Sequence, residues 1–323
     1  MRKGRLRGII QAVKWCDIAV VGGGELVQDD SSLLYSPFNL LPVFLAFLFR
    51  KRSFAWAVGI GQGRELTFLT RRLAGLAMKT LAGLTVRDRG SFNVLYGMGL
   101  REPSMLLAAD CALARLPESG EKEMLIGAAP RDVSNRARHL LPLELRKKLG
   151  IHRKTDQTRA VSAWAKLLDW YASKYSASVV LFPFHTGTLS NDDLAFCKKI
   201  AGKMKNPVEI SDPSDTEGFL GRLYKCRIVV TTPLHGAILS FASGSVPVSV
   251  SYSTKCTRFM EQAGLSALVS AGTPGIPDRS TAVAVEMAWN EFDSFKALVM
   301  KRGDELQLRA GKTLEHFRRT FSL

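Results

Sequence analysis

His235 is the residue whose type and position point most clearly to chemistry. It follows a β-branched run at residues 228–230 and a polar turn, and it precedes an apolar stretch of small residues with helical character. We therefore expect the imidazole where a strand passes into the N-terminus of a helix. Ligands bind at such strand ends in open α/β sheets, because the free backbone N–H groups and the helix dipole favour anions.

Two cations follow other predicted strands in the same way. Residues 247–255 repeat the strand-turn plan and end in Lys255, and Arg131 follows a predicted strand at residues 124–129. Arginine and lysine bind phosphate and carboxylate groups, and an imidazole with an ordinary pKa near ~6.5 exchanges protons in either direction. The pattern favours acid/base chemistry beside a negatively charged substrate. The alternative for each residue alone is structural: a helix-capping histidine and solvated surface cations.

The elements that must position these residues alternate between strands and helices. This alternation predicts an α/β protein with parallel sheets. The polar stretch at residues 117–122 predicts a linker between two Rossmann-like domains, residues 1–118 and residues 119–323, the second closed by C-terminal helices over residues 281–321. The strands are expected at residues 17–21, 53–58, 84–86, 108–112, 124–129, 178–182, 208–210, 228–230 and 247–250.

Composition restricts the class of partner. The chain has 323 residues, 46% of them hydrophobic and 23% charged, which is typical of a globular protein. Its net charge of +16 favours acidic partners: phosphorylated metabolites, anionic lipid surfaces or nucleic acid. Nucleic acid is not expected, because the sequence has neither a long basic block nor a base-stacking aromatic motif.

Cysteine usage and hydropathy bear on the compartment. The five scattered cysteines form no C-x-x-C pair, which argues against disulfides and structural zinc and predicts a cytoplasmic protein. No metal site is predicted, since no histidines or carboxylates cluster at ligand spacing. We find no signal peptide, and the apolar residues 40–49 are too few to span a bilayer. Their basic flank at residues 50–52 is compatible with peripheral contact with an anionic membrane at its inner face.

An ordered set of segments resembles the polysaccharide pyruvyl transferases. A glycine triplet after a strand is common, so each segment is weak alone, and the order gives the set its specificity. The matching segments are Val21-Gly22-Gly23-Gly24-Glu25, Gly59-Ile60-Gly61, Thr85-Val86-Arg87-Asp88, Ala109-Asp110, Pro130-Arg131, Phe182-Pro183-Phe184-His185, Asp192-Asp193 and Leu234-His235-Gly236-Ala237, followed by Tyr252 and Lys255.

The resemblance implies a fold and a reaction. Such enzymes are similar to GT-B glycosyltransferases with two Rossmann-like domains. They transfer the pyruvyl group of phosphoenolpyruvate (PEP) to two hydroxyls of a glycan, forming a cyclic ketal in cell-surface or exopolysaccharide biosynthesis. PEP is then a co-substrate and no other cofactor is expected. By resemblance His235 serves the chemistry, while Arg131, Lys255 and Gly236 hold PEP in the C-terminal domain.

The N-terminal domain is expected to bind the acceptor, a glycan or lipid-linked saccharide. The candidates for this contact are Gly23, Gly24, Glu25 and Asp29, together with His185 of the second domain. For the glycines the alternative is a tight turn, and for His185 it is a role in bracing a loop.

Two departures from the family pattern leave other functions open. Pro233 stands where the family often has an arginine, so that Arg258 or Arg227 would have to substitute. The family's usual first strand-helix unit is also expected to be missing. The alternatives are a nucleotide-sugar glycosyltransferase of the same fold and a catalytically silent family member.

Overall fold

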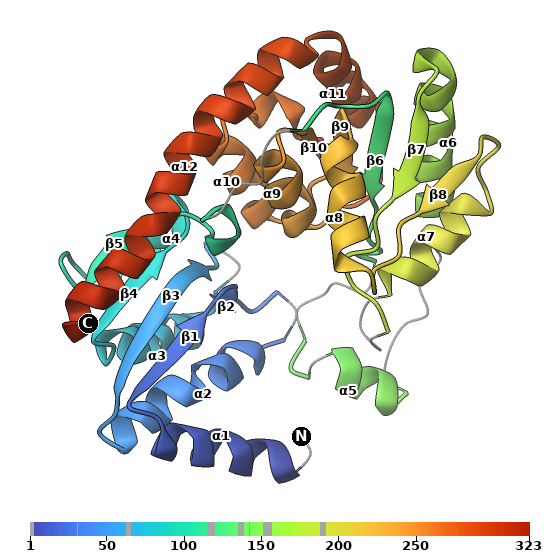
Figure 1. Cartoon of the computed structure of the whole chain (residues 1–323). Coiled ribbons are helices and arrows are strands. Elements are labelled where there is room, and N and C mark those ends of the chain that lie inside the picture. The colour runs from blue at the N-terminus through green and yellow to red at the C-terminus, as the bar shows by residue number, and fades with distance from the viewer. Residues whose placement is uncertain are drawn as a thin grey trace. The chain divides into compact units, whose positions relative to one another are not determined.

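The computed structural model describes residues 3–30, 32–62, 66–114, 120–134, 139–141, 143–150, 157–187 and 192–323 (Figure 1). The chain divides into two compact units. The first comprises Met1–Ala114, Arg136–Arg146 and Leu306–Leu323, and the second comprises Arg115–Asn135 and Lys147–Glu305. The C-terminal helix α12 (Phe292–Phe321) thus contributes to both units, whereas the sequence had led us to assign it wholly to the second domain.

The first unit is built on a parallel sheet. Its strands follow the order β1-β3-β4-β5, and β2 pairs with β3 beyond the end of β1. The strand bounds are β1 Ile18–Gly22, β2 Glu25–Val27, β3 Arg52–Ile60, β4 Gly83–Val86 and β5 Met105–Leu107. The helices are α1 Lys3–Trp15, α2 Tyr35–Leu48, α3 Phe68–Lys79 and α4 Arg89–Gly97.

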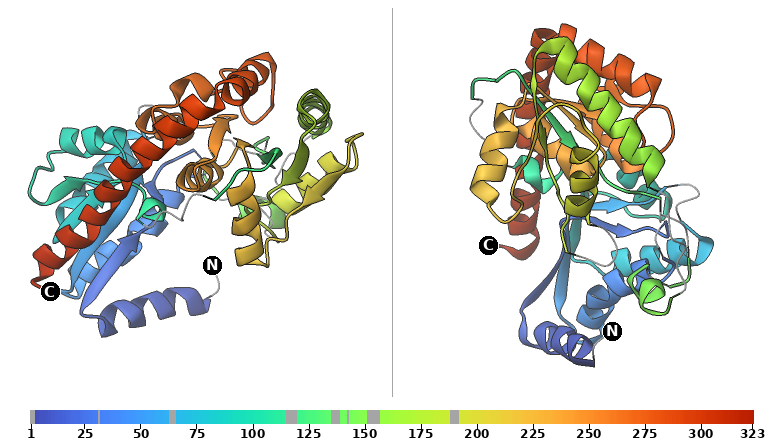
Figure 2. Two further views of the ribbon diagram at one scale, coloured as in Figure 1. Left: turned by 45° about the horizontal axis from the view of Figure 1, so that its top comes forward. Right: turned by 90° about the vertical axis from the view of Figure 1, so that its right-hand side faces the viewer.

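Helices cover both faces of this sheet. Successive strands advance in one direction, so right-handed crossovers put α2, α3 and α4 on one face, over a core that includes Leu40, Ala55 and Leu84. The last part of α12 covers the other face, where Phe317 packs edge-on against Phe54 of β3, and the left view in Figure 2 shows it along the sheet. The aromatic side chain on β3 thus explains why the chain's last turns belong to the first unit.

The second unit is a parallel sheet with the order β10-β9-β6-β7-β8. The strand bounds are β6 Leu125–Ala129, β7 Ser178–Leu181, β8 Val208–Ile210, β9 Ile228–Thr231 and β10 Val246–Ser249. The helices are α6 Thr158–Tyr175, α7 Asp193–Ala201, α8 Thr216–Lys225, α9 Leu234–Ala242, α10 Thr254–Gln262 and α11 Arg279–Asn290. The short α5 (Leu143–Lys148) is divided between the units, and its first four residues belong to the first. The chain builds β6, β7 and β8 in one direction and then returns to add β9 and β10 on the other side of β6.

The prediction of two parallel-sheet α/β halves is confirmed, with local differences. The strand expected at residues 108–112 lies earlier, at Met105–Leu107. A 3-10 turn at Cys111–Leu113 follows it, and the Asp110 carboxylate accepts from the Ala112 N–H there. Strand β2 was not predicted. In the described part of the chain, no helix has the length and apolar character required to cross a bilayer.

Candidate functional site

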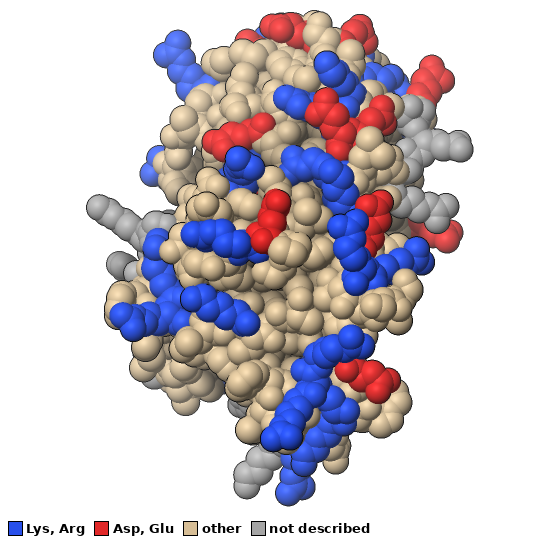
Figure 3. Space-filling view, turned by 90° about the vertical axis from the view of Figure 1, so that its left-hand side faces the viewer, with Lys and Arg blue, Asp and Glu red and all other residues tan. Residues whose placement is uncertain are grey.

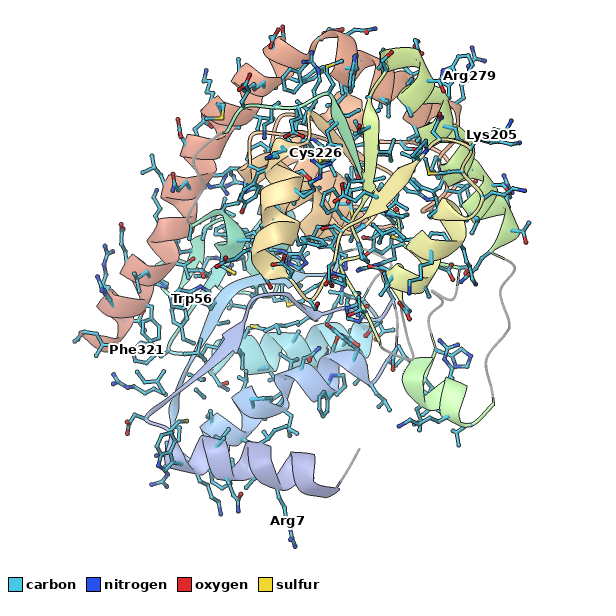
Figure 4. All side chains as sticks on the ribbon, turned by 45° about the vertical axis from the view of Figure 1, so that its right-hand side comes forward. Arg7, Trp56, Lys205, Cys226, Arg279 and Phe321 are labelled. Carbon is cyan, nitrogen blue, oxygen red and sulfur yellow. The ribbon has the colours of Figure 1, made fainter. Side chains whose placement is uncertain are left out.

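The strand order of the second sheet identifies one edge as a ligand site. The order reverses between β6 and β9, which are hydrogen-bonded neighbours. In open parallel sheets ligands bind outside the carboxyl ends of the two strands at such a reversal. Arg131 follows β6 and His235 follows β9, so they flank the reversal, and Lys255 follows the adjacent β10. Cys226, labelled in Figure 4, precedes β9 and marks the other side of the sheet, where the strands have their amino ends.

Arg131 is held by a buried carboxylate. Its Nε lies 3.1 and 3.2 Å from the two carboxylate oxygens of Asp193, and one Nη lies 2.7 Å from Oδ2. The Asp193 side chain is 1% exposed and that of Arg131 18%. Asp193 opens α7, where its N–H donates to the carbonyl of His185. The bidentate pair fixes the guanidinium plane and uses Nε and one Nη, so that the second Nη faces away from the Asp193 carboxylate.

Tyr252 links the two cations. Burial alone lowers the pKa of Arg131, but hydrogen bonding and charge from Asp193, with a contribution from Tyr252, raise it above its ordinary value. On the other side, the Lys255 Nζ lies 5.6 Å from the centre of the Tyr252 ring, a cation–π distance. The structure therefore brings Arg131, Tyr252 and Lys255 into one cluster at the carboxyl edge of the sheet.

His235 is the second residue of α9, and its side chain is exposed. Pro233 is the N-cap of this helix and offers no side-chain hydrogen bond to the first N–H groups. Thr232, at the end of β9, is 1% exposed, and its hydroxyl oxygen has no hydrogen-bond partner within the described residues. A helix N-terminus without a side-chain cap, next to a buried hydroxyl, has hydrogen-bonding capacity for an anion.

Gly236 has a packing role that the sequence did not reveal. A Cβ on this residue would lie 2.2 Å from the Thr231 Oγ1 and 3.4 Å from the Ala129 Cβ. The glycine thus lets the first turn of α9 approach the ends of β9 and β6 directly, and thereby positions His235.

We expect Gly236→Ala to destabilise the second unit by about 1–3 kcal/mol, because the added methyl overlaps an inflexible β-branched side chain. Denaturant unfolding measures this loss. Gly221→Ala on α8 is the matched control, since a Cβ there meets nothing within 4 Å. Equal stability of the two variants would contradict the packing role.

The two arginines considered as substitutes for the residue at position 233 lie in different places. Arg227 precedes β9, at the opposite edge of the sheet, and stacks over Phe292 with its guanidinium carbon 4.0 Å from the ring centre. It is therefore not part of this site. Arg258 lies on α10 three residues after Lys255, on the same side of the helix, and its Nη donates to Thr254. Arg258 therefore remains the candidate for the anion contact that the family's arginine at position 233 would make.

The other predicted site residues are distributed over the two units. His185 follows β7, the neighbour of β6, and its side chain is exposed. In the first unit Gly23 has a φ of +76° and Gly24 accepts a hydrogen bond from Gly59, so both form the turn between β1 and β2. Glu25 is half-buried in β2.

Asp29 is wholly buried in the first unit. Its oxygens accept from the Thr67 N–H at 2.7 Å and the Thr70 hydroxyl at 2.8 Å, which ties the chain after β2 to the start of α3. These contacts give Asp29 a structural role. No group of three His, Cys, Asp or Glu side chains could hold a metal ion among the residues described.

Sequence reasoning did not single out Asp193 and Tyr252 as site residues. Asp193 lies 62 residues from Arg131, and only the fold brings them together. The sequence did contain one signal. Asp193 comes after the predicted strand that ends at Phe182–His185, just as Arg131 comes after the strand at residues 124–129, so both could have been expected at the same side of the sheet.

Comparison with known families decides the identity of the chain. The model of the polysaccharide pyruvyl transferase family matches residues 2–254. The chain belongs to this family. The amylovoran biosynthesis protein AmsJ of Erwinia amylovora is 22% identical over 321 residues, covering 95% of this chain and 74% of AmsJ.

Solved structures with the same fold include two complexes with UDP. Staphylococcus aureus MnaA, solved with UDP, superposes with a TM-score of 0.63 at 12% identity, covering 100% of this chain and 80% of that one. Anabaena HepE with UDP has a TM-score of 0.56 at 12% identity, covering 98% and 81%. At these identities the likeness shows the GT-B-like fold alone.

Proposed function

We propose that this family member transfers the pyruvyl group of PEP to two hydroxyls of a glycan, in the assembly of a cell-surface or extracellular polysaccharide. The observation that supports PEP as donor is the cluster of Arg131, Tyr252 and Lys255 beside the strand-order reversal. PEP is a small dianionic or trianionic acid with a phosphate and a carboxylate a few bonds apart, which suits two separate cations. AmsJ, named for amylovoran biosynthesis, supports the polysaccharide context.

The reaction consists of an addition to C2 followed by a substitution at the same carbon. A proton adds to the methylene carbon of PEP, which becomes a methyl group, while a glycan hydroxyl forms a bond to C2, giving a tetrahedral phosphate-bearing intermediate. The second hydroxyl then bonds to C2 as the C–O bond to phosphate breaks, which yields the cyclic ketal and inorganic phosphate. One hydroxyl proton replaces the proton given to carbon, and the other leaves with phosphate or solvent.

The chain's residues have separate tasks in this scheme. Lys255 binds the PEP phosphate as a point charge, and Arg131 presents the N–H groups that Asp193 does not use to the carboxylate. His235 acts as general acid toward the methylene carbon or as the relay for the attacking hydroxyl's proton. Arg131 is thus paired with Asp193, and Lys255 brings a second positive charge to the cluster.

Product analysis tests the proposal. The purified chain is incubated with PEP and a panel of defined hexosides in D2O, and products are followed by phosphorus and proton NMR. We expect inorganic phosphate and a ketal methyl carrying one deuterium. The nucleotide-sugar alternative, suggested by the UDP complexes of MnaA and HepE, predicts UDP release from UDP-glucose or UDP-N-acetylglucosamine and no consumption of PEP.

Lys255→Ala should weaken PEP binding by about 10- to 100-fold, because a charge-assisted hydrogen bond contributes about 1.5–3 kcal/mol. Isothermal titration with PEP measures the loss. Lys198→Ala on α7, an exposed lysine of the same unit, serves as the control. Unchanged affinity in Lys255→Ala would remove this residue from the PEP site.

We place the reaction in the cytoplasm. No disulfide bond joins any of the five cysteines, Cys16, Cys111, Cys197, Cys226 and Cys256, as is typical of reducing compartments. We propose that the glycan acceptor, free or lipid-linked, binds to the first unit.

A further inference from the structure

We infer that the outer surface of helices α1, α2 and α3 is a docking surface for an anionic membrane. This surface, here called the helical face, belongs entirely to the first unit. Helix α2 packs between the other two, in contact with both α1 and α3. The inference extends the proposed function, because it places the transferase where a lipid-linked acceptor would be.

The helical face exposes large apolar side chains that a surface helix normally buries. Helix α2 contains no charged residue in its 14 positions, and its outward residues are as apolar as those it buries. Phe47 is 65% exposed and Leu48 69% at its C-terminal end. The other large apolar side chains exposed on the three helices are Leu6, Trp15, Tyr35, Phe38, Phe68, Leu69 and Leu76. Exposed apolar patches of this extent mark interaction sites.

The charges of the helical face are all of one sign. Among the described side chains, α1 carries two basic residues (Arg7 and Lys14) and α3 carries three (Arg71, Arg72 and Lys79), and none on the three helices is Asp or Glu. Over the whole chain 29 acidic residues offset 45 basic ones, so this segregation departs from the composition. Arg50 and Lys51 extend the basic charge past the end of α2. Figure 3 shows the gathering of Lys and Arg at the end of the unit that carries α1, and Figure 4 shows Arg7 directed away from α2.

Apolar and basic groups also alternate at close range. The Lys14 Nζ lies 5.0 Å from the centre of the Phe49 ring, and the Arg72 guanidinium carbon lies 4.8 Å from that of Phe68. Membrane-binding surfaces typically expose Trp, Phe and Leu side chains between Lys and Arg. The apolar groups insert at the level of the lipid headgroups, and the basic groups bind anionic lipids. A second copy of the chain fits this surface poorly, since two such faces bring like charges together with no acidic residue from these helices.

Vesicle binding tests the inference on the full chain, without PEP or glycan, so that its failure leaves the transfer chemistry untouched. We expect cosedimentation with vesicles of phosphatidylcholine and phosphatidylglycerol, none with phosphatidylcholine alone, and weaker binding as salt rises. Arg71→Glu/Arg72→Glu should weaken binding at least about 20-fold, because each basic side chain near an anionic surface contributes about fivefold. Phe47→Ser/Leu48→Ser should weaken it at low salt as well.

The control variant Lys166→Glu/Lys198→Glu makes the same change in net charge on exposed positions of the second unit. It should alter vesicle binding far less than the Arg71→Glu/Arg72→Glu pair. Thermal unfolding checks that all variants remain folded. The inference is overturned by absence of binding to the phosphatidylglycerol vesicles, or by equal losses in the control. It is also overturned if light scattering finds a dimer that Phe47→Ser/Leu48→Ser dissociates, because the face would then join two copies.

Discussion

Replacing His235 by alanine should lower kcat for ketal formation by about 10²- to 10⁴-fold, the usual contribution of a positioned general acid or base. The affinity for PEP should stay close to that of the unmodified protein, because the cations and the α9 N-terminus, and not the imidazole, hold the anion in this account. The two effects are measured separately, by turnover with a hexoside acceptor and by calorimetric titration with PEP.

His139→Ala is the matched control for this experiment. His139 is an exposed histidine of the first unit whose backbone carbonyl, which the substitution keeps, accepts from Leu33. Its turnover should equal that of the unmodified protein. Retention of full turnover by His235→Ala would remove the imidazole from the chemistry. Loss of PEP binding together with turnover would make His235 a ligand of PEP and not a proton donor.

Arg131→Met should destabilise the second unit by about 3 kcal/mol. The substitution leaves the Asp193 carboxylate, 1% exposed, without its bidentate partner, and breaking a buried pair in this way typically costs about 3–5 kcal/mol. We expect the lower end of that range, because Asp193 lies in the first turn of α7, where the helix dipole stabilises a negative charge. Denaturant unfolding followed by fluorescence measures the change.

A double variant separates the ion pair from general effects of the substitution. Arg131→Met/Asp193→Leu removes both charges, and it should recover most of the lost stability, because no unpaired charge is then buried. PEP binding should remain weak in the double variant, since the carboxylate contact is absent in both. If Arg131→Met is as stable as the unmodified protein, the Asp193 carboxylate does not require Arg131 as its partner. This result would contradict the role of Asp193 in positioning the Arg131 guanidinium.

The fold was largely predictable from the sequence because most of its strands, including β4, β6 and β9, are buried on both faces. Runs such as Ile228–Thr231 are short, apolar and β-branched, and each ends in a turn followed by a helix. Strand β2 escaped prediction because its three residues directly follow the glycine triplet and continue a polar segment that suggested a loop. The assignment of the last part of α12 to the first unit depends on aromatic contacts to Phe54, which no local pattern encodes.

The site was predictable only in part. The polar residues after β6, β9 and β10 could be assigned to one edge, because parallel strands end at the same side of a sheet. The pairing of Arg131 with Asp193 and the position of Tyr252 between the two cations depend on side chains from distant loops. Asp29 shows what a sequence pattern leaves out: its position after a glycine triplet predicts a site, and only the structure shows its contacts with the start of α3.

A crystal structure of the protein with PEP tests the central claim most directly. We expect PEP at the carboxyl ends of β6, β9 and β10, with phosphate and carboxylate oxygens within hydrogen-bond distance of the Lys255 Nζ and an Arg131 Nη. The methylene carbon should face His235. PEP bound at any other position, with these three side chains unoccupied, would contradict it.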